Sequence, residues 1–135
     1  MSSITTDQGI LHYEVLGRGK PVIFLHGWLG SWGLWKETIE TIALTNRAYA
    51  LDFWGFGDSD DKRSTYRVQD FVALIRQFMD QLGLEKVPLV GHSMGGTVSL
   101  MTALTHPERV ERLAVIGSPI AGSSLSFFLQ LAGRR

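Results

Sequence analysis

A serine between two glycines is the part of this sequence that could do chemistry. Gly91, Ser93 and Gly95 fit the pattern G-x-S-x-G, between the apolar run Val87 to Val90 and a stretch rich in Ala, Leu and Met. A serine hydroxyl attacks well when it is exposed, loses its proton during attack and faces donors for the developing oxyanion. A strand-to-helix turn exposes the hydroxyl and directs backbone N–H groups, that of Met94 first, toward that charge. The pattern therefore predicts Ser93 as a nucleophile.

Two other glycine motifs are alternatives to a serine turn. Gly91 and Gly96 have the spacing of a phosphate loop, but Thr97 stands where that motif needs lysine. The segment Gly55 to Gly57 begins a dinucleotide fingerprint, but Asp60 stands at its third glycine position. Both alternatives fail on these substitutions, whereas the glycines beside the serine are the small residues that a close approach of strand and helix requires.

Apolar runs of strand length supply the elements that must position this serine. Residues 4–6 and 11–16 surround Asp7-Gln8-Gly9, which predicts a hairpin. Four later runs are apolar throughout, as expected of parallel strands covered on both faces. They are Val22 to Leu25, Ala48 to Leu51, Val87 to Val90 and Leu113 to Ile116.

Apolar residues three and four positions apart predict two helices, and a third is expected after the serine turn. Trp35, Ile39 and Ile42 mark the first. The second covers residues 68–82, with Ser64 or Thr65 as N-cap and Gly83 just past its end, and the third runs from Met94 to about Thr105. Strands and helices alternate, which predicts an α/β fold with a mostly parallel, doubly wound sheet.

Sites in such sheets form at the carboxyl ends of the strands. Three segments at these ends, residues 26–30 (HGWLG), 52–59 (DFWGFGDS) and 91–96 (GHSMGG), resemble the N-terminal portion of an α/β-hydrolase fold serine hydrolase. They occur in the order found in that family, and the resemblance spans about residues 11–119. We therefore expect the sheet to be of the α/β-hydrolase type.

The resemblance also implies roles for particular residues. Ser93 would be the nucleophile, and the backbone N–H groups of Trp28 and Met94 would form the oxyanion hole. Structural residues at the site would be His26 and Gly27 in the oxyanion loop, Gly91 and Gly95 beside the serine, and Asp52 at the start of the loop beside the pocket. Neither a metal nor a cofactor is implied.

The partners of a serine triad are not visible in the sequence. Downstream of Ser93 the chain has one histidine, His106, two glutamates and no aspartate. His106 would lie about 20 Å from Ser93 along one helix, too far for a general base. His26 acting from the neighbouring loop is an alternative, although a structural imidazole is the favoured interpretation. His12 and His92 are expected to be packing or surface residues.

These absences predict a sheet truncated after its sixth strand. Residues 1–120 would be the N-terminal part of the hydrolase core, and residues 121–135 would begin a cap. The leading hypothesis is a serine hydrolase of neutral, apolar carboxylic esters or related acyl substrates, with the triad acid and histidine missing from this chain. A perhydrolase, a carbon–carbon bond hydrolase and an aminopeptidase stay open within the fold. The alternative of another class is a catalytically inert fragment or binding module.

Composition restricts the partners. Thirteen Lys and Arg balance thirteen Asp and Glu over 135 residues, which argues against nucleic acid and favours a small apolar substrate. The chain has no cysteine, no signal-like N-terminus and no apolar run long enough to span a membrane, so a cytoplasmic location is expected. An exposed sheet edge at residues 113–116 would favour self-association or complementation by another chain.

Overall fold

The computed structural model describes residues 2–28, 30–60 and 67–117. Its strands are β1 (Ser2–Thr6), β2 (Gly9–Leu16), β3 (Pro21–Leu25), β4 (Arg47–Leu51), β5 (Val87–His92) and β6 (Val110–Ile116). Its helices are η1 (Trp32–Trp35), α1 (Lys36–Ile42), α2 (Val68–Leu82), α3 (Met94–Thr105) and η2 (Pro107–Arg109), of which η1 and η2 are short 3-10 turns.

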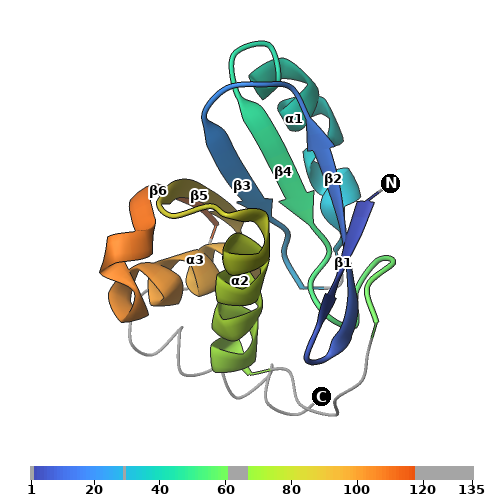
Figure 1. The fold of residues 1–135 in the computed structure, drawn as a ribbon, viewed down its shortest axis with the longest axis vertical. Helices are drawn as coiled ribbons and strands as arrows, with labels where there is room; N and C mark the ends of the chain where they lie inside the picture. Colours follow the sequence, from blue (N-terminus) through green and yellow to red (C-terminus); the bar gives the residue numbers. More distant parts are fainter. Residues whose placement is uncertain (1, 29, 61–66, 118–135) are drawn as a thin grey trace.

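The six strands form one mixed sheet in the order β1-β2-β4-β3-β5-β6 (Figure 1). The hairpin strand β1 pairs antiparallel with β2, and β2 pairs antiparallel with β4. The pairs β3–β4, β3–β5 and β5–β6 are all parallel. The predicted α/β fold is confirmed, and β6 is the last strand of the described residues.

Each face of the sheet has its own core. Strand β3 shows why its run is apolar at every position, since successive side chains point to opposite faces. Ile23 and Leu25 lie in the larger core, which α2 and α3 cover, whereas Val22 and Phe24 lie in the smaller core beneath α1. The sheet is therefore covered on both sides at its centre, as the uniformly apolar strands predicted.

Helix α2 follows its predicted apolar face but begins differently. Its buried positions include Phe71, Ile75 and Phe78, and it ends at Gly83, whose φ of 69° is the left-handed conformation of a helix C-cap. The N-cap is Arg67, not Ser64 or Thr65 as predicted. A carboxylate in the first turn, that of Asp70, accepts the N–H of Arg67 at 3.1 Å and satisfies the helix start instead.

The remaining predicted elements fall close to their expected positions. Helix α3 covers Met94–Thr105 as predicted, and the first predicted helix is a 3-10 turn, η1, that continues into α1. The predicted cap segment, residues 121–135, lies outside the described residues. None of the described helices is both long and apolar enough to cross a bilayer.

Candidate active site

Ser93 lies at the junction of β5 and α3 in a strained conformation. Its φ of 53° and ψ of −118° make it the one non-glycine residue with positive φ in the described part of the chain. Such a conformation costs on the order of 1–3 kcal/mol and persists only when its surroundings hold it. Its N–H donates to the carbonyl of Ile116 at 2.9 Å, and its own carbonyl accepts the N–H of Gly96 at 3.0 Å. These bonds fix the serine between the end of β6 and the first turn of α3.

The two neighbouring glycines allow strand and helix to meet at this turn. A Cβ on Gly91 would collide with the backbone of Gly95 and Gly96. A Cβ on Gly95 would collide with the carbonyl groups of Leu25 and His26, at the end of β3. The first turn of α3 therefore packs directly against two strand ends, and no larger residue fits at either glycine without moving backbone.

Gly27 brings the loop after β3 next to the serine. A Cβ on Gly27 would lie 3.0 Å from the Cβ of Ser93, so these two residues are already in contact. The loop turns sharply here, with the N–H of Gly30 donating to the carbonyl of Gly27 at 3.0 Å. Trp28 follows, and its ring packs edge-on against Phe56 with the centroids 5.1 Å apart. The segment that carries Trp28 thus begins beside the Ser93 side chain.

His26 is fully buried, and both of its ring nitrogens are engaged. Nε2 accepts the backbone N–H of Phe53 at 3.0 Å, so the proton of the neutral ring is on Nδ1, which donates to the carbonyl of Gly27 at 2.7 Å. Burial lowers the pKa of His26, although the Gly27 hydrogen bond and the charge of Asp52 oppose this. A histidine whose basic nitrogen already accepts a backbone N–H is not available as a general base.

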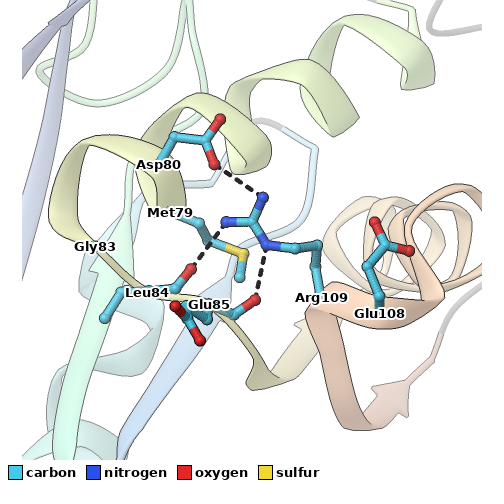
Figure 2. A pocket seen from close by; sticks show the side chains of 7 residues that line it. All are labelled: Met79, Asp80, Gly83, Leu84, Glu85, Glu108 and Arg109. Atoms are coloured by element: carbon cyan, nitrogen blue, oxygen red, sulfur yellow. Dashed lines mark hydrogen bonds and ion pairs between the residues drawn. The ribbon is translucent and has the colours of Figure 1, made fainter.

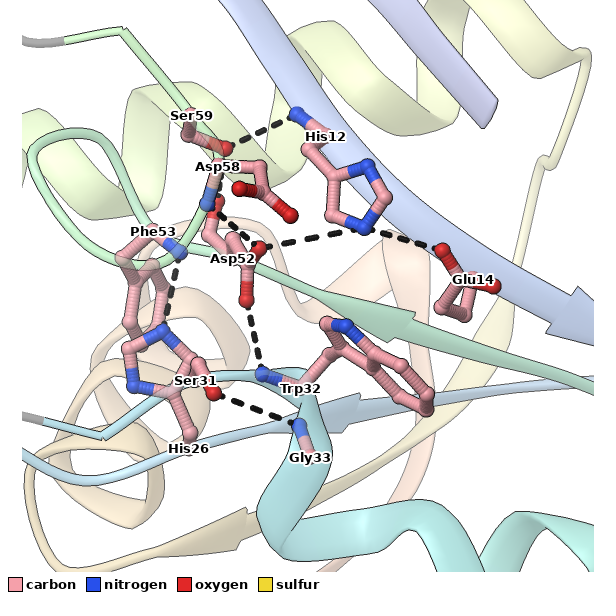
Figure 3. A network of polar contacts seen from close by, with 10 residues as sticks. All are labelled: His12, Glu14, His26, Ser31, Trp32, Gly33, Asp52, Phe53, Asp58 and Ser59. Carbon is pink, nitrogen blue, oxygen red and sulfur yellow. Dashed lines mark hydrogen bonds and ion pairs between the residues drawn. The ribbon is translucent and has the colours of Figure 1, made fainter. Parts of the chain in front are cut away.

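Asp52 is buried at the centre of a polar network (Figure 3). Its Oδ1 accepts the N–H of Trp32 at 2.7 Å, and its Oδ2 accepts the N–H of Asp58 at 2.9 Å. Its backbone carbonyl accepts the hydroxyl of Ser59 at 2.7 Å. His12 also belongs to this network, and it is neither at the surface nor packed among apolar groups only. Sequence reasoning missed its place, because only strand pairing brings β2 beside residue 52.

The same residues include a trio with metal-type ligand atoms. His12, Asp52 and Asp58 each offer one such atom, and these lie within 4.8 Å of one another. Both carboxylate oxygens of Asp52 already accept backbone N–H groups, and Nε2 of His12 lies 2.9 Å from Oε2 of Glu14. Nε2 of His12 makes no hydrogen bond among the described residues, but the two engaged oxygens of Asp52 describe a hydrogen-bonded network better than a metal centre.

No histidine hydrogen-bonds to the Ser93 hydroxyl within the described ranges. His106 caps the far end of α3, where its Nδ1 lies 3.8 Å from Oε1 of Glu108, so Ser93 and His106 stand at opposite ends of one helix as predicted. His92 precedes the serine, and its buried Nδ1 has no hydrogen-bond partner among these residues. The described site therefore holds a positioned hydroxyl and close backbone, without a base.

A surface pocket of about 480 Å³ lies away from this site (Figure 2). It is lined by Met79, Asp80, Gly83, Leu84, Glu85, Glu108 and Arg109, near the C-terminal ends of α2 and α3. The Arg109 guanidinium is occupied by Asp80 at 2.8 Å and by the carbonyl groups of Leu84 and Glu85 at 2.9 and 2.7 Å. Because its cation is already paired, this pocket is not a stronger candidate than the serine turn.

Comparison with known proteins agrees with the fold. A family model for the alpha/beta hydrolase fold matches residues 20–132. The soluble epoxide hydrolase of Corynebacterium sp. (strain C12) is 33% identical over 106 residues, 78% of this chain and 37% of that protein. The 2-hydroxy-6-oxo-2,4-heptadienoate hydrolase of Pseudomonas putida is 35% identical over 107 residues, 76% of this chain and 39% of that protein.

Solved structures give the same result. An esterase from Exiguobacterium antarcticum superposes with a TM-score of 0.82 at 29% identity, over 88% of this chain and 46% of the esterase. The chain belongs to the α/β-hydrolase family. It spans less than half the length of these relatives.

Proposed function

We propose that this chain carries the nucleophile of a serine hydrolase that forms an acyl-enzyme on Ser93. The observation that carries the proposal is the strained turn that holds Ser93 against Gly27, the residue that opens the loop bearing Trp28. Strain at a polar residue that the surrounding backbone holds in place is characteristic of functional sites. The Ser93 hydroxyl attacks the acyl carbon, the leaving group departs, and water then releases the acid.

Backbone N–H groups stabilise the negative charge in this proposal. Met94 is the first residue of α3, and the first N–H groups of a helix have no intrahelical acceptor and point toward anions. Trp28 supplies the second N–H from the loop after β3. Each oxyanion donor of this type contributes on the order of 3 kcal/mol to the transition state.

The general base and the acid come from polypeptide outside the described residues. The basic nitrogen of His26, Nε2, already accepts the backbone N–H of Phe53, and His106 lies at the other end of α3. Strand β6 forms one edge of the described sheet and carries Ile116, which is 51% exposed. This edge is where a further strand bearing a histidine would pair, either from the same protein or from a second chain.

The substrate class follows from the serine and from the surroundings. A serine that opened an epoxide would leave an ether, which water does not cleave, whereas an acyl-serine ester is readily hydrolysed. We therefore favour acyl substrates over the epoxides named for the Corynebacterium relative. The balanced charge of the chain and the apolar Trp28 and Phe56 rings, which pack against each other, favour a neutral, apolar acyl group.

Carbon–carbon bond hydrolysis is the second candidate within this fold. The observation that favours it is the 35% identity to the Pseudomonas putida heptadienoate hydrolase. Assays with aryl esters and with vinylogous 1,5-diketones as parallel substrates distinguish the two, because the diketone yields an acid and an enol product.

Labelling with a fluorophosphonate tests the nucleophile without knowledge of the substrate. We expect a mass increase of one phosphonyl group on the peptide that contains Ser93, absent in Ser93→Ala and unchanged in His106→Ala. At neutral pH the labelling is slow, because removing the base of a comparable triad lowers the turnover number about a million-fold. At alkaline pH, hydroxide takes the place of the missing general base, and labelling should be faster. Failure to label Ser93 there, or labelling that survives Ser93→Ala, would favour the inert-fragment or binding-module alternative.

A further inference from the structure

The carboxylate of Asp52 is an unusual charge, because it is fully buried beneath the proposed oxyanion loop. It accepts two backbone N–H groups, from Trp32 and Asp58. Gly57 lies directly against it, since a Cβ at that position would collide with the carboxylate atoms. A buried carboxylate is stable only when hydrogen bonds and an opposite charge compensate for lost hydration.

His12 is the basic side chain within ion-pair distance of this carboxylate in the part of the chain that the structure describes. Its Nε2 lies 3.8 Å from Oδ2 of Asp52 and 2.9 Å from Oε2 of Glu14 (Figure 3). The side chain of His12 is 3% exposed, so water screens these contacts little. This buried nitrogen has no hydrogen-bond partner among the described residues, so its contact with Asp52 is one of ion-pair distance only.

The backbone of His12 is tied to the same carboxylate residue. Its N–H donates to Oγ of Ser59 at 2.8 Å, and that hydroxyl donates to the carbonyl of Asp52. The carbonyl of His12 in turn accepts the N–H of Asp52 at 3.0 Å. The ring and the backbone of His12 together place Asp52 relative to strand β2. The position of the carboxylate therefore depends on both parts of His12.

Asp52 passes this placement on to the loop beside Ser93. The Trp32 N–H that it holds is the first donor of η1, where the loop after β3 ends. The other end of that loop is fixed by His26, which joins Gly27 to Phe53, the residue after Asp52. Gly27 and Trp32, on either side of this loop, are thus held by hydrogen bonds that lead to residues 53 and 52.

We propose that His12 is a positioning residue of this hydrolase: its ring, at ion-pair distance, and its backbone hydrogen bonds hold Asp52, which through the Trp32 N–H holds the loop that presents the Trp28 amide to the oxyanion. The inference rests on the proposed function for the role of Trp28. The contact from His12 to Trp32 itself can be tested without substrate.

Amide hydrogen exchange of Trp32 in the full chain is the test, with the β3 amide of Phe24 as an internal reference for global opening. His12→Asn retains a polar side chain but cannot place a donor at the Nε2 position. We expect it to speed exchange at Trp32 about tenfold to a hundredfold relative to Phe24, since a hydrogen bond to a charged group is weakened.

His12→Gln is the matched rescue variant, because its longer amide places a donor where Nε2 stood. We expect exchange at Trp32 within about threefold of the wild-type rate, and His106→Gln, outside the network, to match wild type. If His12 only filled space, the Gln and Asn variants would show the same exchange rate at Trp32. If His12→Asn does not fold, His12→Gln still decides: a wild-type rate at Trp32 supports the proposal, and exchange raised there relative to Phe24 contradicts it.

A double-mutant cycle with Asp52→Asn tests the route. In that background the effect of His12→Asn on Trp32 should shrink to less than about threefold, because the carboxylate through which it acts is gone. An unchanged Trp32 rate in His12→Asn, equal rates in the Asn and Gln variants, or a full effect in the Asp52→Asn background would each overturn the proposal. Failure of the phosphonate experiment with these exchange results intact would instead count against the serine hydrolase.

Discussion

The two ends of helix α3 are built on different physical principles. At its start, Ser93 is held by backbone hydrogen bonds at positive φ, beside glycines that leave no space for a side chain. Just beyond its other end, in η2, Arg109 reaches across to Asp80 and to two carbonyl groups beside an open pocket, with both charged side chains partly exposed (Figure 2). One end is defined by backbone proximity and the other by a surface ion pair.

This difference shows where structural precision is concentrated. Close-packed backbone cannot adjust to an added atom, so the serine end tolerates almost no change. A partly exposed ion pair is screened by water and contributes little net stability. Substitutions at the serine end should therefore cost more than substitutions at the arginine end, although both ends contain several polar contacts.

Gly95→Ala is expected to have the largest effect. Its Cβ would meet the carbonyl groups of Leu25 and His26, so β3 and α3 must separate. We expect a loss of about 3 kcal/mol in the free energy of unfolding, measured by urea denaturation. Gly33→Ala is the control, because the nearest atom to its Cβ would be Oγ of Ser31 at an ordinary 3.5 Å. Equal losses in the two variants would contradict the close-packing argument.

Ser59→Ala should have the next largest effect. It removes the hydroxyl that accepts the N–H of His12 and donates to the carbonyl of Asp52, both in partly buried positions. We expect about 2 kcal/mol from leaving these groups without a partner. Thr45→Ala, which removes an exposed hydroxyl, serves as the control and should change urea stability by less than about 0.5 kcal/mol.

Arg109→Ala should cost only about 1 kcal/mol despite removing three contacts, because its partner Asp80 is 47% exposed. Thermal unfolding in low and high salt measures this effect. The difference between wild type and variant should shrink at high salt. A loss as large as that in Gly95→Ala would remove the contrast between the two ends.

The smallest effect expected is a pH dependence that comes from His26. Its pKa is lowered by burial, so the folded chain binds fewer protons than the unfolded chain, whose histidine has the ordinary value of 6.5. This contribution is therefore complete above 6.5 and is lost as pH falls below it toward the lowered pKa. Urea titrations of wild type and His26→Gln from neutral to mildly acidic pH should show a steeper decline in wild type. Parallel curves would assign the slope to other groups.

Much of the fold was predictable because its signals are local. The apolar runs and the residues before and after Ser93 each act within a few positions, and β3, β5 and α3 fall where they indicated. The start of α2 was predicted wrongly, because hydroxyl side chains were preferred as N-caps over a carboxylate in the first turn, Asp70, which accepts the Arg67 N–H.

Contacts between distant segments were not predictable in the same way. His12 meets Asp52 only because β2 pairs antiparallel with β4, and no periodicity within β2 distinguishes a network histidine from a packed one. His26 likewise finds Phe53 through the parallel pairing of β3 with β4. Sequence motifs identified the residues near the serine, whereas strand register decides which of them touch.

One hydrogen bond sets a limit for anyone who divides this protein into two pieces. The N–H of Ser93 donates to the carbonyl of Ile116, the last residue of β6, twenty-three positions later in the chain. A fragment cut after α3 would keep the whole serine motif and lose the acceptor that holds its backbone. A split reporter or a fusion built on this fold should therefore have its division point beyond Ile116, because the smallest unit that shapes the nucleophile includes β6.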